Sequence, residues 1–520
     1  ADHGNAGTSL RTGSEKEPGG QQGASGILRI VRSPEKDGQK TVRGGQRGKT
    51  KCPIYRECGG CQYLHLTYDQ QLKEKQKRME ELLGGVCPVR PIIGMEEPYH
   101  YRNKVHAVFG LDRKNNPISG IYKEGTHRIL PVDSCLIEDQ KADEIIVTIR
   151  SMLRSFKIRV FDEDTGYGLL RHVLIRRGFT TGEILVVLVT ASPVFPSKNN
   201  FVKALREKHP EITTIVQNIN GRSTSMVLGD KEHVLYGKGY IEDVLCGLRF
   251  RISSRSFYQI NSAQTEKLYA KAMELAELTG NETVLDAYCG IGTIGLIASK
   301  HAGKVIGVEL NQDAVRDAVQ NAKKNGITNA QFFCNDAGRF MSHMAARGES
   351  ADVVFMDPPR SGSTEEFIDA VALMQPKRVV YISCGPDTLA RDLKIFAKHG
   401  YRAKEAWPVD LFGWTGHVET VVLLSKGEIE SKKIRVEFSL EDMDMSGFQK
   451  GATYGQIKER ILQQTGLKVS SLYIAQIKQK CGIIERENYN KPKSENARQP
   501  KCPPEKEKAI MEALKYFGMI

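Results

Sequence analysis

The sequence lacks an apolar run long enough to cross a membrane, since none approaches the ~18 consecutive apolar residues of a spanning helix. It also lacks a secretory signal, because the apolar stretch GILRIV (26–31) is too short and carries no cleavage signature. Acidic residues are fewer than basic ones: the chain has 62 Asp and Glu against 75 Lys and Arg, which gives a formal net charge of +13. We therefore expect a cytoplasmic protein that does not bind membranes. Its positive charge predicts a polyanionic binding partner.

The eleven cysteines are too unevenly spaced for a disulfide framework, which predicts a reducing compartment. Three of them, Cys52, Cys58 and Cys61, lie close together in CPIYRECGGC, with two glycines between the last pair. Such spacing lets thiolates converge on one centre, which favours an iron–sulfur cluster. A zinc site is the alternative, because C-x2-C also suits tetrahedral coordination.

The stretch VLDAYCGIGTIGL (284–296) predicts a strand, a glycine turn and the start of a helix, and Glu309 ends the next predicted strand. Its glycines match the G-x-G-x-x-G pattern of dinucleotide sites, with an acidic residue downstream for a ribose hydroxyl. Asp286, just before these glycines, would repel a pyrophosphate but suits the sulfonium and ammonium groups of S-adenosylmethionine. The pattern therefore favours a methyl donor, and a nicotinamide cofactor in an oxidoreductase is the alternative.

Two later apolar runs, VVFMDPPR (353–360) and VVYISCGP (379–386), predict short buried parallel strands that end at Pro or Gly. Ligands bind at the carboxyl ends of such strands in open α/β sheets. Cys384 stands at this end, where the following Gly385 and Pro386 can present its thiol to a substrate. A packed structural cysteine is the alternative.

Strand and helix patterns alternate from residue 284 to about residue 400. Two strand patterns without a helix between them follow, YRAKEAWPVD (401–410) and HVETVVLLS (417–425), and predict an antiparallel hairpin. Seven strands closed by such a hairpin resemble the class I S-adenosylmethionine-dependent methyltransferase domain, a doubly wound α/β sheet with helices on both faces.

The motifs FYQIN, DAYCGIGT, GVE, DPPR, SCGP and HVE occur in this order between residues 256 and 425. In that order they resemble the RNA 5-methyluridine methyltransferase family, and CPIYRECGGC, YRNK and LLRHVLIRRG extend the resemblance upstream over 52–178. The resemblance implies Cys384 as the nucleophile and Glu419 as the base that removes a proton. It also implies five donor-binding residues: Gln259, Tyr288, Glu309, Asp336 and Asp357.

The same resemblance adds Cys135 as the fourth ligand of a [4Fe-4S] cluster, beside Cys52, Cys58 and Cys61. Because the cluster accompanies the ribosomal branch of the family, we expect a monomeric enzyme that methylates a uridine in 23S ribosomal RNA. Transfer RNA is the alternative substrate. A catalytically inactive RNA-binding assembly factor is the alternative class of protein.

The expected residue types suit this reaction. Carbon 5 of uracil is a poor nucleophile, and thiolate attack at carbon 6 converts the ring into an enolate that takes the methyl group. A thiolate both attacks and departs well near neutral pH, and a carboxylate removes the carbon 5 proton.

Enzymes that make 5-methylcytosine generally carry a cysteine where this chain has Arg360. Arg360 is expected to hold the uracil or a phosphate, or else to pair with Asp336 or Glu365. The loop LFGWTGH (411–417), before Glu419, is expected to fold over the site.

Composition and motifs divide the chain into four regions. They are a disordered basic Gly-rich segment (1–50), a mixed α+β central domain with the cluster loop and an RNA-binding surface (51–251), the catalytic domain (252–426) and an accessory domain (427–520). The first segment lacks the alternating strands of the β-barrel RNA-binding module that many family members carry there. The accessory domain is expected to hold a strand near 432–441, then two helices joined by a short turn, typical of a helix-turn-helix module.

The central domain is expected to contain helices near 68–83 and 142–156 and strands in HAVFGL, HVLIRRG and EILVVLVTA. Its basic and aromatic residues are candidates for RNA contacts by stacking and phosphate binding. These candidates are Tyr101, Arg102, Asn103, Lys104, Arg171, His172, Arg176 and Arg177.

Overall fold

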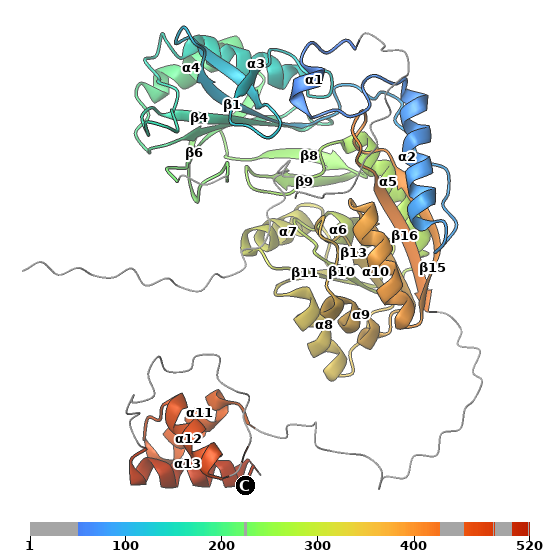
Figure 1. Cartoon of the computed structure of the whole chain (residues 1–520), viewed down its shortest axis with the longest axis vertical. Helices are drawn as coiled ribbons and strands as arrows, with labels where there is room; N and C mark the ends of the chain where they lie inside the picture. The colour runs from blue at the N-terminus through green and yellow to red at the C-terminus, as the bar shows by residue number, and fades with distance from the viewer. Residues whose placement is uncertain (1–49, 223–225, 427–451, 482, 484–501, 518) are drawn as a thin grey trace, which may run out of the picture. The chain divides into compact units, whose positions relative to one another are not determined.

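The structure is a computed structural model that describes residues 50–222, 226–426, 452–481, 483, 502–517 and 519–520 (Figure 1). The chain forms two compact units, 1–429 and 430–520. The expected disordered segment, up to residue 49, and the strand predicted at 432–441 lie outside the described residues. No described helix is long and apolar enough to cross a membrane.

One seven-stranded sheet of the first unit has the strand order β12-β11-β10-β13-β14-β16-β15. Its first five strands are parallel, and β16 runs antiparallel between β14 and β15. The strands are β10 (Thr283–Ala287), β11 (Lys304–Glu309), β12 (Ala330–Cys334), β13 (Val353–Met356), β14 (Arg378–Ser383), β15 (Tyr401–Val409) and β16 (Glu419–Lys426). This sheet, called the methyltransferase sheet below, confirms the predicted methyltransferase fold with its antiparallel closing strands.

Helices pack on both faces of the methyltransferase sheet, as its doubly buried strands require (Figure 1). One face is covered by α5 (Ser262–Ala276), α6 (Thr293–Ala298) and α7 (Gln312–Lys324). The other is covered by α8 (Ala337–Ala346), α9 (Glu365–Met374), α10 (Pro386–Lys398) and α2 (Tyr68–Leu83). The last of these comes from the segment before both sheets, and its Met79 and Leu83 are fully buried. The predicted helix at 68–83 is thereby confirmed at both ends.

The other seven-stranded sheet, the central sheet, has the order β3-β2-β1-β4-β5-β6-β7. The strands are β1 (Lys104–Leu111), β2 (Pro117–Tyr122), β3 (Ile129–Pro131), β4 (Leu170–Arg177), β5 (Ile184–Thr190), β6 (Ile212–Ile219) and β7 (Lys231–Tyr236). One face packs against α3 (Gln140–Met152) and α4 (Lys198–Lys208). The helix predicted near 142–156 thus begins and ends earlier than expected.

The two sheets of the first unit share a hydrophobic core. Leu185 and Val187 of β5 belong to the same buried cluster as Val284 and Val380 of the methyltransferase sheet. The hairpin of β8 (Ile241–Leu245) and β9 (Leu248–Ile252) adds further side chains to this cluster. Burial on both faces explains why every residue of β5 is buried.

The second unit contains three helices among its described residues: α11 (Tyr454–Thr465), α12 (Ser471–Lys480) and α13 (Pro504–Tyr516). Their apolar residues, among them Ile457, Ile474 and Ile510, form a separate core. Gly466 ends α11 in a left-handed conformation (φ 70°), which glycine adopts without strain. The predicted pair of helices and the final helix are confirmed.

Candidate active site

Cys384 and Glu419 lie at the same end of two neighbouring strands. Cys384 directly follows β14, and Glu419 is the first residue of β16. The antiparallel register pairs Ser383 with Thr420, so Cys384 and Glu419 are the next residues across the two strands. Cys384 is half-buried and Glu419 is only 2% exposed. The structure thus brings together the two residues expected to act on the substrate ring.

A third acidic group stands beside this pair. Asp357 follows β13, which neighbours β14 on its other side. Burial raises the pKa of Asp357 to about 7. Burial, followed by the Asp357 carboxylate, raises the pKa of Glu419 to about 8. Burial and then both carboxylates raise the pKa of the Cys384 thiol above its usual range. These groups disfavour each other's negative charge, so the site suits a cationic ligand.

Two residues of this site can interact with a ligand. Glu419 Oε2 is buried and has no hydrogen-bond partner among the described residues, and such an oxygen gains from a ligand that donates to it. Arg360 is exposed, and in the described part of the chain it forms no ion pair with Asp336 or Glu365, which removes one of the two roles considered from the sequence. Its positive charge lowers the pKa of Cys384 and Glu419, against the larger effect of burial.

The glycine turn lies at the carboxyl end of β10. Tyr288 begins this turn in a left-handed conformation (φ 66°). The Gly290 amide donates to Glu309 Oε2 at 3.1 Å, and the Gly295 amide donates to Asp286 Oδ2 at 2.7 Å. Asp286 is fully buried, and burial raises its pKa to about 8. Asp286 therefore holds the start of α6, a role that the sequence pattern did not reveal.

The remaining two donor-binding candidates, Asp336 and Gln259, lie in different parts of the first unit. Asp336 follows β12, is exposed and caps α8, where its Oδ1 accepts from the Arg339 amide at 2.9 Å. Gln259 is buried on the segment before α5, and its carbonyl oxygen accepts from Asn103 Nδ2 at 2.9 Å. Four candidates thus share the carboxyl edge of the methyltransferase sheet, and Gln259 alone lies outside it. The four are Tyr288, Glu309, Asp336 and Asp357.

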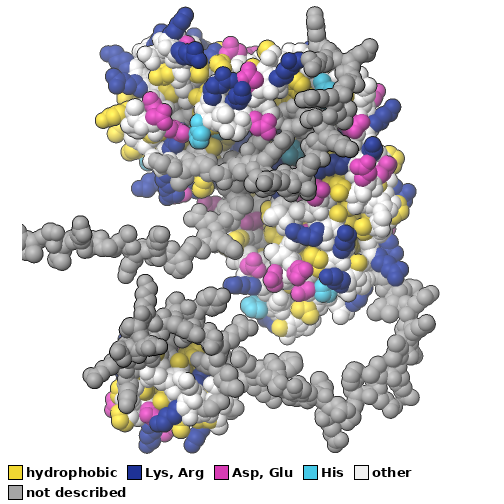
Figure 2. Space-filling model, viewed as in Figure 1, with side chains coloured by type: hydrophobic (Ala, Val, Ile, Leu, Met, Phe, Trp, Pro, Cys, Tyr) yellow, Lys and Arg dark blue, Asp and Glu magenta, His cyan; other side chains and the backbone are white. Residues whose placement is uncertain are grey.

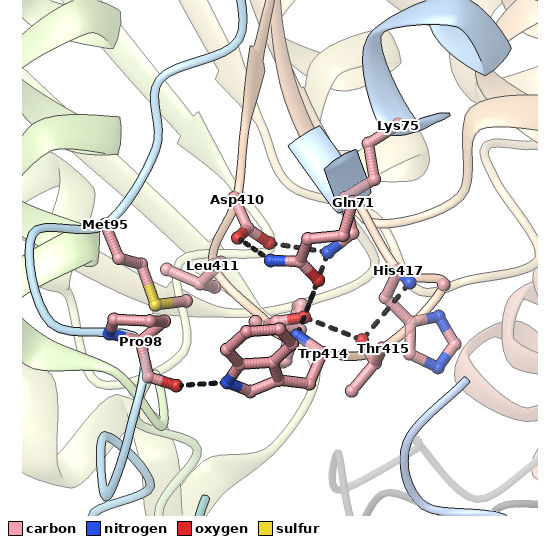
Figure 3. Close-up of polar contacts among 12 residues, drawn as sticks. Gln71, Lys75, Met95, Pro98, Asp410, Leu411, Trp414, Thr415 and His417 are labelled. Carbon is pink, nitrogen blue, oxygen red and sulfur yellow. Dashed lines mark hydrogen bonds and ion pairs between the residues drawn. The ribbon is translucent and has the colours of Figure 1, made fainter. Parts of the chain in front are cut away.

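The loop between β15 and β16 is pinned by α2 and does not form an open flap (Figure 3). Lys75 Nζ lies 2.5 Å from Asp410 Oδ1 and donates to the Phe412 carbonyl at 3.0 Å. Gln71 donates to Asp410 Oδ2 at 3.1 Å and accepts from the Trp414 amide at 2.8 Å. Lys75 and Asp410 are 1% and 0% exposed. These bonds and the buried Trp414 fix the loop in place, and its expected position over the site stays a prediction.

The segment 52–63 carries Cys52, Cys58 and Cys61 and is called the cysteine loop below. It is hydrogen-bonded to the loop between β15 and β16. The backbone amides of Gln62 and Tyr63 donate to the Trp414 carbonyl at 2.9 and 3.0 Å. The Gln62 side chain accepts from the Gly416 amide at 2.9 Å and donates to the Gly59 carbonyl at 2.8 Å. The loop that carries the expected cluster ligands therefore touches the segment that leads to Glu419. Sequence reasoning missed this link, because its partners are more than 350 residues apart.

The four expected cluster ligands lie within electrostatic reach of one another. Burial, followed by the charges of Cys58 and Cys52, raises the pKa of Cys61 to about 12. Cys61 acts in the same direction on Cys135, after the larger effects of burial and of Glu138. No three His, Cys, Asp or Glu side chains of the described residues are grouped closely enough to hold a metal ion. The thiols are thus gathered but not arranged as a metal site.

Cys87 is separate from this group of thiols. It is 5% exposed and packs in the core between α2 and the methyltransferase sheet. The spacing of cysteines alone does not choose between Cys87 and Cys135. The structure places Cys135, and not Cys87, beside the cysteine loop.

Comparisons with known proteins point to one family. The family model described as tRNA (Uracil-5-)-methyltransferase matches residues 67–427. An uncharacterized RNA methyltransferase of Halalkalibacterium halodurans is 44% identical over 73% of this chain and 83% of its own length. A second one, of Staphylococcus aureus strain MSSA476, is 42% identical over 74% of this chain and 86% of its own length.

A solved structure is similar to the first unit. It is the Pyrococcus abyssi tRNA (uracil-54, C5)-methyltransferase in complex with S-adenosyl-L-homocysteine. It aligns with a TM-score of 0.60 and 28% identity, and covers 71% of this chain and 86% of that chain.

Proposed function

The chain belongs to the tRNA (uracil-5-)-methyltransferase family of S-adenosylmethionine-dependent RNA methyltransferases, and on that premise we propose its substrate, mechanism and site residues. The enzyme methylates carbon 5 of a uridine in 23S ribosomal RNA through a covalent bond between Cys384 and the uracil. The observation that carries the mechanism is the placement of Cys384 and Glu419 across the β14–β16 ladder, with Glu419 Oε2 unpartnered. The enzyme acts as a monomer.

The reaction begins at Cys384. Its thiolate attacks carbon 6, a sulfur–carbon bond forms, and the electron pair of the ring double bond moves toward the carbon 4 oxygen. S-adenosylmethionine supplies the methyl group that carbon 5 takes up. Glu419 then accepts the carbon 5 proton, the ring double bond forms again, and the Cys384 thiolate leaves. Arg360 favours the charged forms of both residues, which matters because burial opposes them.

The donor is held along the carboxyl edge of the methyltransferase sheet. Tyr288, Glu309, Asp336 and Asp357 line this edge, and Gln259 contributes from the segment before α5. The raised pKa values of Asp357 and Glu419 support a sulfonium ligand, because a nearby positive charge relieves the repulsion between the two carboxyl groups.

Cys52, Cys58, Cys61 and Cys135 are the ligands of a [4Fe-4S] cluster. The residue types support this cluster, since four free thiols lie close enough to influence one another's pKa. A bound cluster would crosslink the cysteine loop to the segment between β3 and α3 that carries Cys135. Anaerobically purified protein is expected to contain about four iron and four sulfide per chain, and Cys58→Ala to lose them. Stoichiometric zinc without iron would overturn this assignment.

The substrate is tested with labelled donor. Wild-type enzyme is incubated with ribosomal or transfer RNA, and the RNA is digested to nucleosides. We expect label in 5-methyluridine from 23S ribosomal RNA and none with Cys384→Ser, because a serine alkoxide is inaccessible near neutral pH. Label in 5-methylcytosine, ribose or purines would reject the mechanism, and no label at all would favour an RNA-binding assembly factor.

Transfer RNA is the second candidate substrate. It is supported by the Pyrococcus abyssi structure, whose enzyme is described as acting on uracil 54 of transfer RNA. Label in 5-methyluridine from transfer RNA alone would keep the mechanism and replace the ribosomal substrate.

A further inference from the structure

A stripe of basic side chains runs along one face of β1. Lys104 and His106 alternate with the buried Val105, so these two basic residues share a face of the strand, and Arg102 lies two residues before the strand begins. The opposite face of β1 packs into the core with α3. The basic face is therefore not the one that the helices of the central sheet cover.

Strand β4 extends this stripe. The antiparallel register places Arg176 opposite Lys104 and His172 opposite Val108, and directly opposed residues share a face. The rings of His106 and His172 lie diagonally across the pair with their centroids 5.0 Å apart. Four basic side chains of two adjacent strands thus meet on one surface of the central sheet.

No carboxylate compensates these four groups. Burial and neighbouring cations lower the pKa of Lys104 and His172, and no acidic residue of the described chain opposes them. The same holds for His106, whose pKa falls to about 4 through burial and the Lys104 charge. Burial also lowers the pKa of Arg176, to about 10. Burying cations side by side without a partner is unfavourable unless an anion joins them.

Unpartnered nitrogen atoms point to the same conclusion. His172 is 7% exposed, yet its Nδ1 has no hydrogen-bond partner among the described residues, and neither has His106 Nε2. Arg176 is 4% exposed and is engaged, because one of its terminal nitrogens donates to the carbonyls of Ser254, at 3.4 Å, and of Ser256. The other two basic candidates of β4 form ion pairs. Arg171 pairs with Glu163 at 3.3 Å, and Arg177 pairs with Asp139 at 2.7 Å.

The outer surface differs from this stripe. On the face of the first unit shown in Figure 2, Lys and Arg side chains are interspersed with Asp and Glu. Such a mixed surface gives no continuous path for a polyanion. The stripe, by contrast, carries one sign of charge over two strands.

The stripe begins beside the candidate active site. Tyr101, next to Arg102, donates to the Gly413 carbonyl at 2.9 Å, in the loop that leads to Glu419. The Arg102 charge contributes to lowering the pKa of His417, after burial, Arg360, Lys75 and Arg78. His417 lies two residues before Glu419. Arg102 therefore stands at the end of the stripe nearer the candidate active site, where its backbone forms an isolated bridge with the half-buried Glu138.

We propose that Arg102, Lys104, His106 and His172 form an anion-binding track for phosphates of the RNA strand that leads to the target uridine, with Arg176 held beside it by the Ser254 and Ser256 carbonyls. The track rests on the proposed function, because it presumes an RNA substrate. Phosphate contacts position a nucleic acid without reading its sequence, which suits an enzyme that must hold a flipped nucleotide against Cys384.

The test compares Lys104→Met with Lys114→Met. Lys104 is half-buried in the stripe, whereas Lys114 is an exposed lysine in the turn between β1 and β2. RNA affinity is measured between about 50 and 200 mM salt. We expect Lys104→Met to weaken binding on the order of tenfold, the effect of one lost charged hydrogen bond. The slope of log affinity against log salt should fall by about 0.7–0.9, and Lys114→Met should leave both unchanged.

Thermal melting separates the track from a structural role. Because Lys104 is an uncompensated cation, Lys104→Met should melt at the same or a higher temperature without ligand. Pyrophosphate should raise the melting temperature of the wild type and of Lys114→Met more than that of Lys104→Met. Unchanged RNA affinity and salt slope in Lys104→Met would overturn the track. Formation of 5-methyluridine by the wild type is scored separately, so failure of the track and failure of the proposed reaction are distinguishable.

Discussion

Glu419 is the residue whose protonation ends the proposed reaction. Glutamine has nearly the same shape but cannot accept the carbon 5 proton. We therefore expect Glu419→Gln to add the methyl group and then stall, with the RNA covalently attached to Cys384. The adduct is measured as a protein band that carries labelled RNA on a denaturing gel.

The double variant Cys384→Ser/Glu419→Gln is the matched control, since it keeps the glutamine but lacks the nucleophile. It should show no adduct. Near-normal turnover of Glu419→Gln without any adduct would remove Glu419 from the role of base.

The raised pKa of Glu419 also predicts how the stability of the folded protein depends on pH. Its ordinary value is 4.5 and its folded value is about 8, so between these pH values the folded state retains a proton that the unfolded state has lost. Stability therefore falls as pH rises from about 4.5 to 8. Glutamine does not titrate. The melting temperature of Glu419→Gln relative to wild type should rise across this interval and then level, and a constant difference from pH 4 to 9 would contradict the assigned burial.

At the scale of elements, sequence periodicity predicted what depends on local pattern. The apolar runs around Cys384 and Asp357 are strands as expected, because continuous apolar residues suit a parallel sheet buried on both faces. The pairing of Lys75 with Asp410 was not predicted, because the two residues lie 335 positions apart and neither belongs to a motif. The contacts that fix the loop 411–417 were not predicted for the same reason.

The contact between α2 and this loop predicts a measurable coupling. Lys75→Met leaves the Asp410 carboxylate buried without its cation, which typically costs about 3–5 kcal/mol of unfolding free energy. Asp410→Asn in the Lys75→Met background removes the stranded charge and should recover part of that loss. Denaturant unfolding of the two single variants and the double variant gives the coupling energy. Additive effects would show that the pair does not act as a unit.

Activity gives a second measure of the same contact. Lys75 lies outside the proposed donor and uracil contacts, but its bond to the Phe412 carbonyl helps to fix the loop before Glu419. Release of this loop should slow proton removal and leave donor affinity near the wild-type value. Lys77→Met on the exposed side of α2 is the control, since Lys77 is 70% exposed. Loss of donor affinity in Lys75→Met would place the loop in the donor pocket instead.

At the scale of the whole molecule, every residue assigned to the reaction belongs to the first unit. The central and methyltransferase sheets share a hydrophobic core, so the cysteine loop, the basic stripe and the catalytic pair are carried by one packed body. The family match ends at residue 427, close to the boundary of that body at Ile429. The second unit has its own core of three helices.

This separation predicts the effect of removing the second unit. A chain that ends at Ile429 should keep its fold, because the core clusters of the first unit are built from its own described side chains. We expect its turnover number with saturating RNA to stay within about twofold of that of the full chain. A twofold change corresponds to roughly 0.4 kcal/mol of transition-state stabilisation. Methyl transfer is measured for both chains over a range of RNA concentrations. If the three-helix unit binds RNA, only the concentration for half-maximal rate will rise. A collapse of the turnover number would instead give the second unit a part in catalysis that no described contact of the first unit requires.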